Sequence, residues 1–385
     1  MRDLTSAPRN VSDNRLLYFS SVPYNSYAQR PHFMATAFAD AGYSVLWVDP
    51  YPTRLPNFSD LRRLRSRRCS IPQAANRVRL CCPLALPIEP LPLGSLINHA
   101  LCWHQVRRQL RDFVTGSVHC VIGIGRPSAL ATWALNSLPY RHSFIDVLDN
   151  FPQFYRGFSR MSMARRLRST CRSVTHVFCS STQLAHNIQV VRQDALIVLN
   201  GYPTNQLPQP SNLLIRTCIG YAGTIGHWFD WPLVCEIASS LPQVPVRLVG
   251  PETVPRPANL PANIEFVGER PFEEMVSFVR EFAVGLIPFQ INALTEGVDP
   301  IKFYEYRSMG VPIWSTTFGE MRLRSMTDGV ELIQHGQNWQ ALWHKTISTE
   351  FNLVEILKFR KNISWTKRFD PVVEYLSPPR LSSFL

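Results

Sequence analysis

The chain has 385 residues, of which 45% are hydrophobic, so it can bury two ordinary cores rather than one. It has no uninterrupted apolar run of roughly 18 residues, which excludes a membrane-spanning helix. The N-terminal sequence MRDLTSAPRNVSDNR lacks the apolar segment of a secretory signal. The nine cysteines form no C-x-x-C pair and no zinc-finger spacing. We therefore expect a cytoplasmic protein with no metal and no disulfide framework.

The net charge of +12 is concentrated in the N-terminal half of the chain. Arginines crowd residues 54–68 and 156–172. Basic clusters of this kind attract an anionic membrane surface, although a solvated, solubilising face is the alternative. Nucleic acid is not expected, because no zinc-finger spacing and no RNP-like aromatic motif accompany the charge. We expect peripheral binding to the inner face of the cytoplasmic membrane.

Strand-like apolar runs alternate with helical patterns along the chain, which predicts an α/β fold with parallel sheets. The expected strands of the first half are Arg15–Ser20, Val45–Val48, Val118–Gly123, Ser143–Val147, Val174–Ser180 and Ala195–Leu199. Those of the second half are Cys218–Ala222, Val246–Val249, Ile264–Val267, Val284–Pro288 and Val311–Ser315.

The stretch between the two sets of strands is rich in Pro, Asn and Gln and is typical of a linker. We therefore expect an N-terminal domain over residues 1–201, a linker over 202–213, and a C-terminal domain with terminal helices over 214–385. Each domain should be a doubly wound, Rossmann-like unit, and the two should face each other across a cleft. Because such sheets bind ligands beyond the carboxyl ends of their strands, functional side chains are sought there.

The loop after the first strand ends at a helix start that carries two candidate residues. Pro31 suits the first turn of a helix. Arg30 could then bind a phosphate, and His32 could act on an acceptor hydroxyl. Alternatively, His32 simply packs against the sheet.

Two acids follow the strand Ser143–Val147. A carboxylate at Asp149 could serve as a general base, whereas the three-residue spacing from Asp146 equally suits an N-cap of the next helix. A lone D-x-x-D pair is a poor magnesium site, so no metal is required here.

A small-residue loop follows the strand Cys218–Ala222. Gly223 and Gly226 would let backbone N–H groups approach a phosphate, and the Thr224 hydroxyl would add a donor. His227 is either a contact on the same side or an ordinary loop histidine.

The segment TEGVDPIKFYEYRSMG, residues 295–310, places charges around a short helix. Asp299 suits the N-cap, Pro300 the first helical position, and Gly310 the C-terminal stop. Lys302 would lie in the first turn, where a helix N-terminus favours a pyrophosphate. Glu305, three residues later on the same face, could accept hydrogen bonds from ribose. The alternative is a surface helix whose Lys302 and Glu305 pair with each other.

This segment resembles the C-terminal nucleotide-binding signature of GT-B glycosyltransferases of the bacterial cell-surface polysaccharide type, the family-4-like "group 1" branch. The resemblance extends over residues 219–317, and residues 17–50 look like the start of the family's acceptor domain. It implies a transferase of the EC 2.4 type, of retaining stereochemistry, that moves a hexosyl group from a nucleoside diphosphate sugar. The implied acceptor is a glycan or lipid-linked sugar, and no cofactor or metal is needed.

The chain departs from the family pattern at one acid and one base. Retaining members carry two glutamates separated by seven intervening residues, but Gly297 stands where the first is expected, so Glu296 or Asp299 would have to replace it. The glycine loop also lacks the family's arginine, which leaves Lys302 helped by Arg30 or Arg126. These departures keep open a second hypothesis, in which the chain is a non-catalytic partner that binds a nucleotide or glycan.

Overall fold

The structure is a computed structural model that describes residues 13–56, 77–210, 216–348 and 352–378. The chain divides into two compact units, which are described separately. Unit 1 contains the chain up to Cys179, together with Ala185–Leu196 and the residues from Phe369 onward. Unit 2 contains Ser180–Leu184 and Ile197–Arg368. The main part of unit 2 thus begins at Ile197, and the chain returns to unit 1 at Phe369. Residues 211–213 of the expected linker lie outside the described residues.

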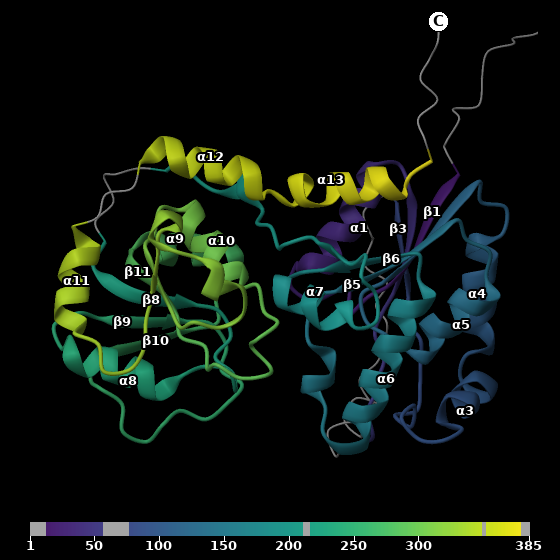
Figure 1. The fold of residues 1–385 in the computed structure, drawn as a ribbon, viewed down its shortest axis with the longest axis horizontal. Coiled ribbons are helices and arrows are strands. Elements are labelled where there is room, and N and C mark those ends of the chain that lie inside the picture. Colours follow the sequence, from purple (N-terminus) through teal and green to yellow (C-terminus); the bar gives the residue numbers. More distant parts are fainter. Residues whose placement is uncertain (1–12, 57–76, 211–215, 349–351, 379–385) are drawn as a thin grey trace, which may run out of the picture. The chain divides into compact units, whose positions relative to one another are not determined.

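Unit 1 is built on a seven-stranded sheet with the order β3-β2-β1-β4-β5-β6-β7. The pairs from β3 through β6 are parallel. The strands are β1 (Asn14–Phe19), β2 (Ser44–Val48), β3 (Val78–Cys81), β4 (His119–Ile124), β5 (His142–Val147), β6 (His176–Cys179) and β7 (Leu196–Ile197). Its helices are α1 (Arg30–Asp40), α3 (Gly94–Leu101), α4 (His104–Val114), α5 (Ala129–Ser137), η1 (Phe151–Phe154) and α6 (Gly157–Ser173), shown in Figure 1.

Unit 2 is built on a six-stranded parallel sheet with the order β10-β9-β8-β11-β12-β13. The strands are β8 (Cys218–Ala222), β9 (Val246–Val249), β10 (Ile264–Gly268), β11 (Phe282–Ile287), β12 (Ile313–Ser315) and β13 (Val330–Leu332). Its helices are η2 (Thr204–Gln206), α8 (Trp231–Ser240), α9 (Phe272–Arg280), α10 (Ile301–Ser308), η3 (Gly319–Leu323), η4 (Met326–Asp328), α11 (Trp339–Ile347) and α12 (Leu353–Ile363). Helices α7 (Thr182–Gln189) and α13 (Trp365–Leu376) each cross the boundary between the units.

Two parallel sheets with helical crossovers confirm the predicted doubly wound α/β fold. All eleven predicted strands exist within a few residues of their expected bounds, whereas β3 and β13 were not predicted. Both missed strands are edge strands of only four and three residues. Such short segments carry too little alternation to be recognised. No helix in the described part of the chain is long and apolar enough to cross a bilayer.

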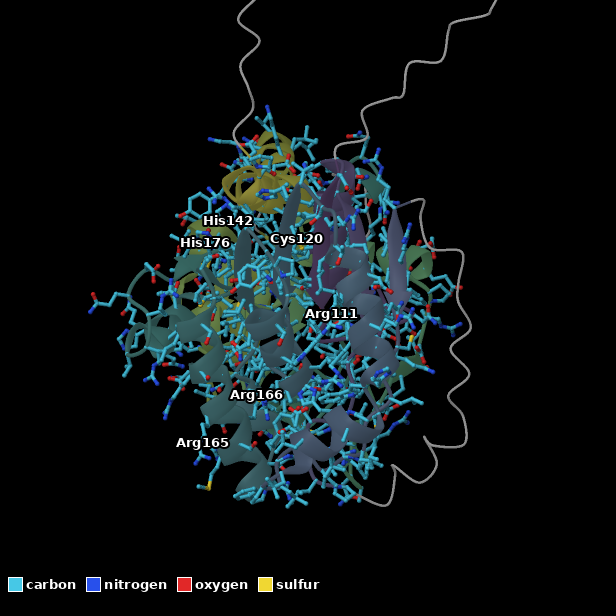
Figure 2. All side chains as sticks on the ribbon, turned by 90° about the vertical axis from the view of Figure 1, so that its right-hand side faces the viewer. Arg111, Cys120, His142, Arg165, Arg166 and His176 are labelled. Carbon is cyan, nitrogen blue, oxygen red and sulfur yellow. The ribbon has the colours of Figure 1, made fainter. Side chains whose placement is uncertain are left out.

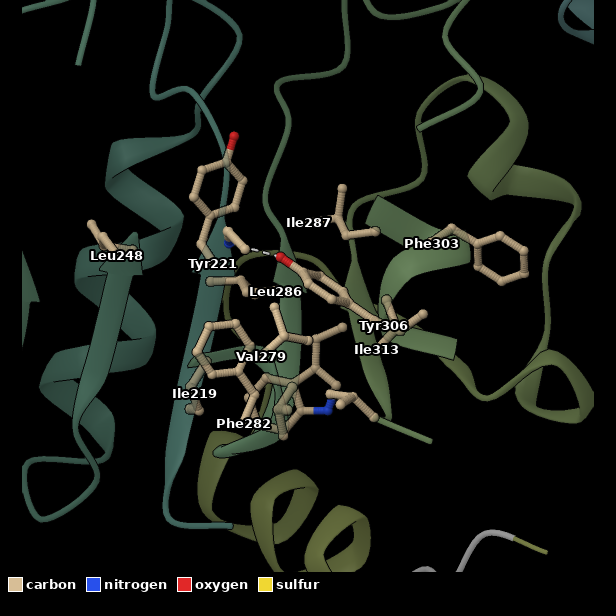
Figure 3. Close-up of a cluster of buried hydrophobic side chains, with 14 of the residues drawn as sticks. Ile219, Tyr221, Leu248, Val279, Phe282, Leu286, Ile287, Phe303, Tyr306 and Ile313 are labelled. Carbon is tan, nitrogen blue, oxygen red and sulfur yellow. Dashed lines mark hydrogen bonds between the residues drawn. The ribbon is translucent and has the colours of Figure 1, made fainter. Parts of the chain in front are cut away.

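The core of unit 2 connects its sheet to α10, as Figure 3 shows. The Tyr306 ring of α10 packs against Gly285 of β11, where an added Cβ would lie 2.3 Å from a ring carbon. The Tyr306 hydroxyl accepts a hydrogen bond of 2.8 Å from the backbone N–H of Ala222, at the end of β8. One side chain thus fixes α10 relative to the two central strands of the sheet.

Candidate active site

Strand order in unit 2 reverses between β8 and β11. From this point β9 and β10 extend to one side of the sheet, and β12 and β13 extend to the other. In open parallel sheets, ligands bind beyond the carboxyl ends of the strands at such a reversal. The loop at Gly223 follows β8, and α10 follows the connection that leaves β11. The topology therefore brings the two predicted nucleotide-binding segments to one place.

The ammonium group of Lys302 lies against the backbone of Gly223. A Cβ added to Gly223 would lie 2.0 Å from Nζ and 2.9 Å from Cε of Lys302. Gly223 also has φ +140, a conformation that side chains with a Cβ rarely adopt. Nζ lies 4.9 Å from the centre of the Tyr221 ring, which is a cation–π distance. Glycine is required here because the lysine occupies the space that a side chain would fill.

The charge of Lys302 has no hydrogen-bonded or ionic partner within the described part of the chain. Burial lowers its pKa, and the carboxylate of Glu305 acts in the opposite direction. A partly desolvated cation that makes no direct ion pair is costly to keep. An anion bound at this point would restore the lost electrostatic stabilisation, so the arrangement suits a phosphate group.

Glu305 lies one turn further along α10 and is only 8% exposed. One of its carboxylate oxygens accepts a hydrogen bond of 2.9 Å from the Tyr202 hydroxyl. Burial raises the pKa of Glu305, while Lys302 and the bond from Tyr202 lower it. No described residue bonds to the second oxygen, which leaves an acceptor for a ligand hydroxyl.

The glycine loop is held by its own backbone and offers fewer donors than expected. The Gly223 N–H donates to the Val249 carbonyl at 2.7 Å, and the Ile225 N–H donates to Pro251 at 2.9 Å. The Tyr221 hydroxyl donates to the Thr224 carbonyl at 2.7 Å. The N–H groups of Gly223 and Ile225 are therefore engaged by backbone carbonyls. Thr224 keeps a hydroxyl with no partner among the described residues, and Gly226 gives room to the Trp228 ring.

Asp299 is not the N-cap of α10. The cap is Pro300, whose backbone is extended, and the helix begins at Ile301. The buried Asp299 carboxylate instead accepts hydrogen bonds of 2.8 Å from the Asn200 N–H and the Tyr304 hydroxyl. Burial raises the pKa of Asp299 to about 6, although nearby Arg324 lowers it. This acid anchors the segment that precedes α10, so its predicted contact with the nucleotide is replaced by a structural contact.

Glu296 and Gly297 lie in the connection between β11 and α10. Glu296 is half-buried, and its carboxylate has no partner within the described residues. The Gly297 carbonyl accepts a 2.8 Å hydrogen bond from the Ser181 hydroxyl. Glu296 therefore presents an unpaired acid within the segment where the family pattern expects its first glutamate.

Arg30 is neutralised inside unit 1. Its guanidinium makes two hydrogen bonds of 2.8 Å to the two oxygens of Asp146, and it lies 5.3 Å from the centre of the Phe369 ring. Arg30 and Asp146 are 3% and 0% exposed. The predicted phosphate contact of Arg30 is thus replaced by a buried ion pair, because β5 brings Asp146 beside the start of α1.

Both ring nitrogens of His32 bond to the backbone. Nδ1 accepts from the Gln29 N–H at 3.1 Å, and Nε2 lies 2.9 Å from the Tyr24 carbonyl oxygen, to which it donates. The imidazole also packs 4.8 Å from the Trp47 ring. His32 closes a capping box at the start of α1, which is the packing alternative rather than the catalytic one.

Asp149 and Arg126 are the remaining predicted residues of unit 1. The N-cap of η1 is Asn150, so Asp149 is free of the capping role that was its alternative. Burial raises the pKa of Asp149 to about 7, Arg30 lowers it, and Asp146 raises it. A carboxyl with this pKa can accept a proton near neutrality. Arg126 donates to the Tyr51 carbonyl at 2.6 Å and is half-buried.

Three tyrosines support the site of unit 2 and were not predicted from the sequence. Tyr221 faces the lysine, Tyr202 bonds to Glu305, and Tyr306 ties α10 to β8. Tyr306 follows Lys302 by four residues, so helical spacing could have placed it near the same face. The partners of Tyr202 and Tyr221 depend on the tertiary fold.

Comparisons with known proteins establish the fold. No protein-family model matches the chain, and no curated protein matches it in sequence. Solved structures match almost its whole length. Sucrose-phosphate synthase from Thermosynechococcus elongatus is 14% identical with a TM-score of 0.58, over 94% of this chain and 94% of that one. HepE from Anabaena, in complex with UDP-glucose, is 13% identical with a TM-score of 0.56, over 94% of each chain. The lipopolysaccharide outer core galactosyltransferase WaaB is 10% identical with a TM-score of 0.54, over 94% of this chain and 99% of that one.

These likenesses define the fold class as GT-B, with two Rossmann-like domains. At such low identity they establish the fold alone, and any activity must be argued from the site.

Proposed function

We propose that the chain is a glycosyltransferase that moves a hexosyl group from a nucleoside diphosphate sugar to a glycan or lipid-linked acceptor in cell-surface polysaccharide biosynthesis. The observation that carries the proposal is the unpaired Lys302 ammonium against Gly223, at the strand-order reversal of unit 2. The structural neighbour bound to UDP-glucose supports a nucleotide sugar as the donor.

In the proposed reaction, an acceptor hydroxyl attacks the anomeric carbon from the same face that the departing diphosphate leaves, while the bond from that carbon to the diphosphate breaks. Negative charge accumulates on the departing diphosphate, and Lys302 stabilises it electrostatically. The unpaired oxygen of Glu305 accepts hydrogen bonds from the ribose hydroxyls and so orients the nucleotide. Much of the acceleration comes from positioning.

Asp149 is the proposed acceptor of the hydroxyl proton, since its pKa of about 7 suits that role. Glu296 is the proposed contact to the donor sugar, and Arg126 a contact on the acceptor side. We propose retention at the anomeric carbon, no metal, and attachment to the inner face of the cytoplasmic membrane. The anomeric configuration of the product, read by NMR, tests the stereochemistry.

The direct test is thermal unfolding across a panel of UDP-, GDP- and dTDP-sugars, because a bound ligand raises the unfolding temperature by mass action. Any stabilising sugar is then assayed for transfer and for slow hydrolysis. We expect one nucleotide class to stabilise the protein and its sugar to be released or transferred. Absence of stabilisation by every donor would contradict the proposal.

A second candidate function is a non-catalytic protein that binds a nucleotide or glycan. Gly297 in place of a glutamate favours it, as do the structural bonds that occupy Arg30 and His32. Stabilisation by a donor with neither hydrolysis nor transfer to any acceptor would support this alternative.

A further inference from the structure

Helix α3 in unit 1 exposes its apolar side and buries its polar side. The exposed side chains repeat at helical spacing and are Leu93, Leu96, Ile97, Ala100 and Leu101. Leu101 is 74% exposed, Leu93 69% and Leu96 60%. The inward side is formed by Gly94 and Asn98, both buried. This is the reverse of an ordinary surface helix, whose apolar stripe faces the core.

The inverted orientation is fixed by specific contacts. The buried Asn98 amide donates to the Leu86 carbonyl at 3.0 Å and accepts from the Leu86 N–H at 2.8 Å. A Cβ on Gly94 would lie 1.9 Å from the Ile88 carbonyl oxygen, so only glycine permits this packing. The helix cannot rotate its leucines inward without breaking these contacts.

The segment before α3 is anchored by a buried acid. Glu89, 4% exposed, accepts hydrogen bonds of 2.6 Å from the Tyr51 hydroxyl and 3.1 Å from the Ala129 N–H. It also lies 3.2 Å from the Arg166 guanidinium of α6. The apolar face of α3 is therefore displayed by an ordered scaffold that joins it to α6.

Leu93 itself has φ 63, and in the described chain it is the one residue other than glycine with positive φ. A left-handed conformation is costly for a residue with a Cβ, and such strain clusters at functional positions. Here it holds an exposed leucine at the N-cap of an apolar helix face.

Helix α6 carries a row of exposed arginines that follows exposed apolar residues along the helix. Its outward stripe contains Phe158 and Met161 in the first turns, followed by Arg165, Arg168 and Arg172. Figure 2 labels Arg165 toward the edge of the view and Arg166 nearer the middle. The contact between Arg166 of α6 and Glu89 places α6 beside the segment that leads into α3. The exposed leucines of α3 suit the acyl region of an anionic bilayer, and the exposed arginines of α6 suit its phosphate headgroups.

We propose that the exposed face of α3, together with the outward stripe of α6, is a docking surface for an anionic lipid bilayer. The leucines of α3 enter the acyl boundary, and the arginines of α6 contact lipid phosphates. A second copy of the chain fits this surface less well, since a two-fold interface joins the same patch on both subunits and would bring two arginine rows together. The inference extends the proposed function by naming the membrane contact, but it requires no sugar donor.

The test is flotation of the full chain with vesicles of phosphatidylcholine, with and without phosphatidylglycerol. We expect binding to the mixed vesicles and much weaker binding to phosphatidylcholine alone. The variant Leu96→Gln with Leu101→Gln should lower the affinity about a hundredfold, since each leucine loses its burial in lipid. Arg165→Gln with Arg168→Gln should lower it about 25-fold, and only on the mixed vesicles.

Matched controls distinguish binding through this surface from non-specific hydrophobic or electrostatic binding to the vesicles. Val118→Gln with Val190→Gln removes two apolar side chains of unit 1 that are 84% and 90% exposed but lie outside α3 and α6. Arg108→Gln with Arg111→Gln removes two exposed arginines of α4. Both controls should bind the mixed vesicles like the parent chain. All variants should keep the parent unfolding temperature, because the changed side chains are exposed.

Three outcomes would overturn the proposal. These are no binding to either vesicle, equal loss in the control variants, or a concentration-dependent dimer that Leu96→Gln with Leu101→Gln dissociates while vesicle binding stays absent. The proposed function is tested separately, by the change in unfolding temperature on addition of nucleotide sugars. The α3 variants should show the same change as the parent chain.

Discussion

Units 1 and 2 each place a basic residue in the first turn of a helix beside a parallel sheet, but they treat its charge in opposite ways. In unit 1, Arg30 is held by both oxygens of Asp146, and Asp149 remains beside the pair with a pKa of about 7. In unit 2, the Lys302 ammonium lies against Gly223 and makes no hydrogen bond or ion pair with any described residue. Unit 1 thus offers a proton acceptor, whereas unit 2 offers a cation.

The largest expected effect is on the proton acceptor of unit 1. Asp149→Asn should lower the transfer rate by about 10²- to 10⁴-fold, the usual contribution of a general base. In the parent enzyme, kcat/KM should rise with pH through about 7, as the Asp149 carboxyl loses its proton. The variant should lack this rise, which a pH–rate profile measures. A rise that persists in the variant would assign the base elsewhere.

Breaking the ion pair of unit 1 tests whether Arg30 is structural. Arg30→Met leaves Asp146 buried without its partner and should lower the free energy of unfolding by about 3–5 kcal/mol. Urea unfolding followed by tryptophan fluorescence measures this. Adding Asp146→Leu should recover most of the loss. Unchanged stability of Arg30→Met, together with lost substrate binding, would return the arginine to the predicted phosphate role.

The same kind of change in unit 2 should affect turnover instead of stability. Lys302→Met removes stabilisation of the departing diphosphate, about 2–4 kcal/mol or roughly thirty- to thousandfold in rate. Because the folded state lowers the pKa of Lys302, the protonated lysine destabilises the fold at neutral pH. The variant should therefore be as stable as the parent or more so. Lys345→Met, which removes an exposed lysine paired with Glu331, serves as the control.

A methyl group at Gly223 tests the contact with Lys302 directly. Gly223→Ala would displace Nζ and force an unfavourable φ, at a cost of about 1–3 kcal/mol. Gly268→Ala separates the two causes, because Gly268 also has positive φ but no atom lies within 4 Å of an added Cβ. Both variants should be destabilised, but only Gly223→Ala should weaken nucleotide binding. Equal binding by the two variants would contradict the contact.

The smallest expected effect concerns a histidine of unit 2. His335 lies 2.6 Å from Glu236 and 3.7 Å from Asp230, and the bond to Glu236 raises its pKa. The resulting stability is fully present below the ordinary histidine pKa near 6.5 and is lost as pH rises through the raised value. His335→Gln should thus lower the unfolding temperature more at acidic pH than at alkaline pH. An equal decrease in unfolding temperature at acidic and alkaline pH would exclude a stabilising ion pair at His335.

The fold followed from the sequence where strands were long and apolar, as in β4, β5 and β11, whose residues are almost all buried. The start of α10 was placed one residue early, because Asp299 suits an N-cap but its carboxylate bonds to Asn200 and Tyr304 instead. Local pattern cannot distinguish a cap from an anchor whose partner lies about a hundred residues away.

The candidate site was only partly predictable. The topological rule placed the Gly223 loop and Lys302 together, whereas the pairing of Arg30 with Asp146 depends on how β5 meets α1. For α3, periodicity indicates an apolar stripe but not its direction. Only the inward bonds of Asn98 reveal that this stripe faces outward.

The central claim, that Lys302 holds the diphosphate, is tested most directly by calorimetric titration of a nucleoside and its diphosphate into the parent chain and Lys302→Met. The base is chosen from the donor panel. We predict that the parent binds the diphosphate much more tightly than the nucleoside, and that this difference largely disappears in the variant while nucleoside affinity is unchanged. An equal preference for the diphosphate in both proteins would contradict the account.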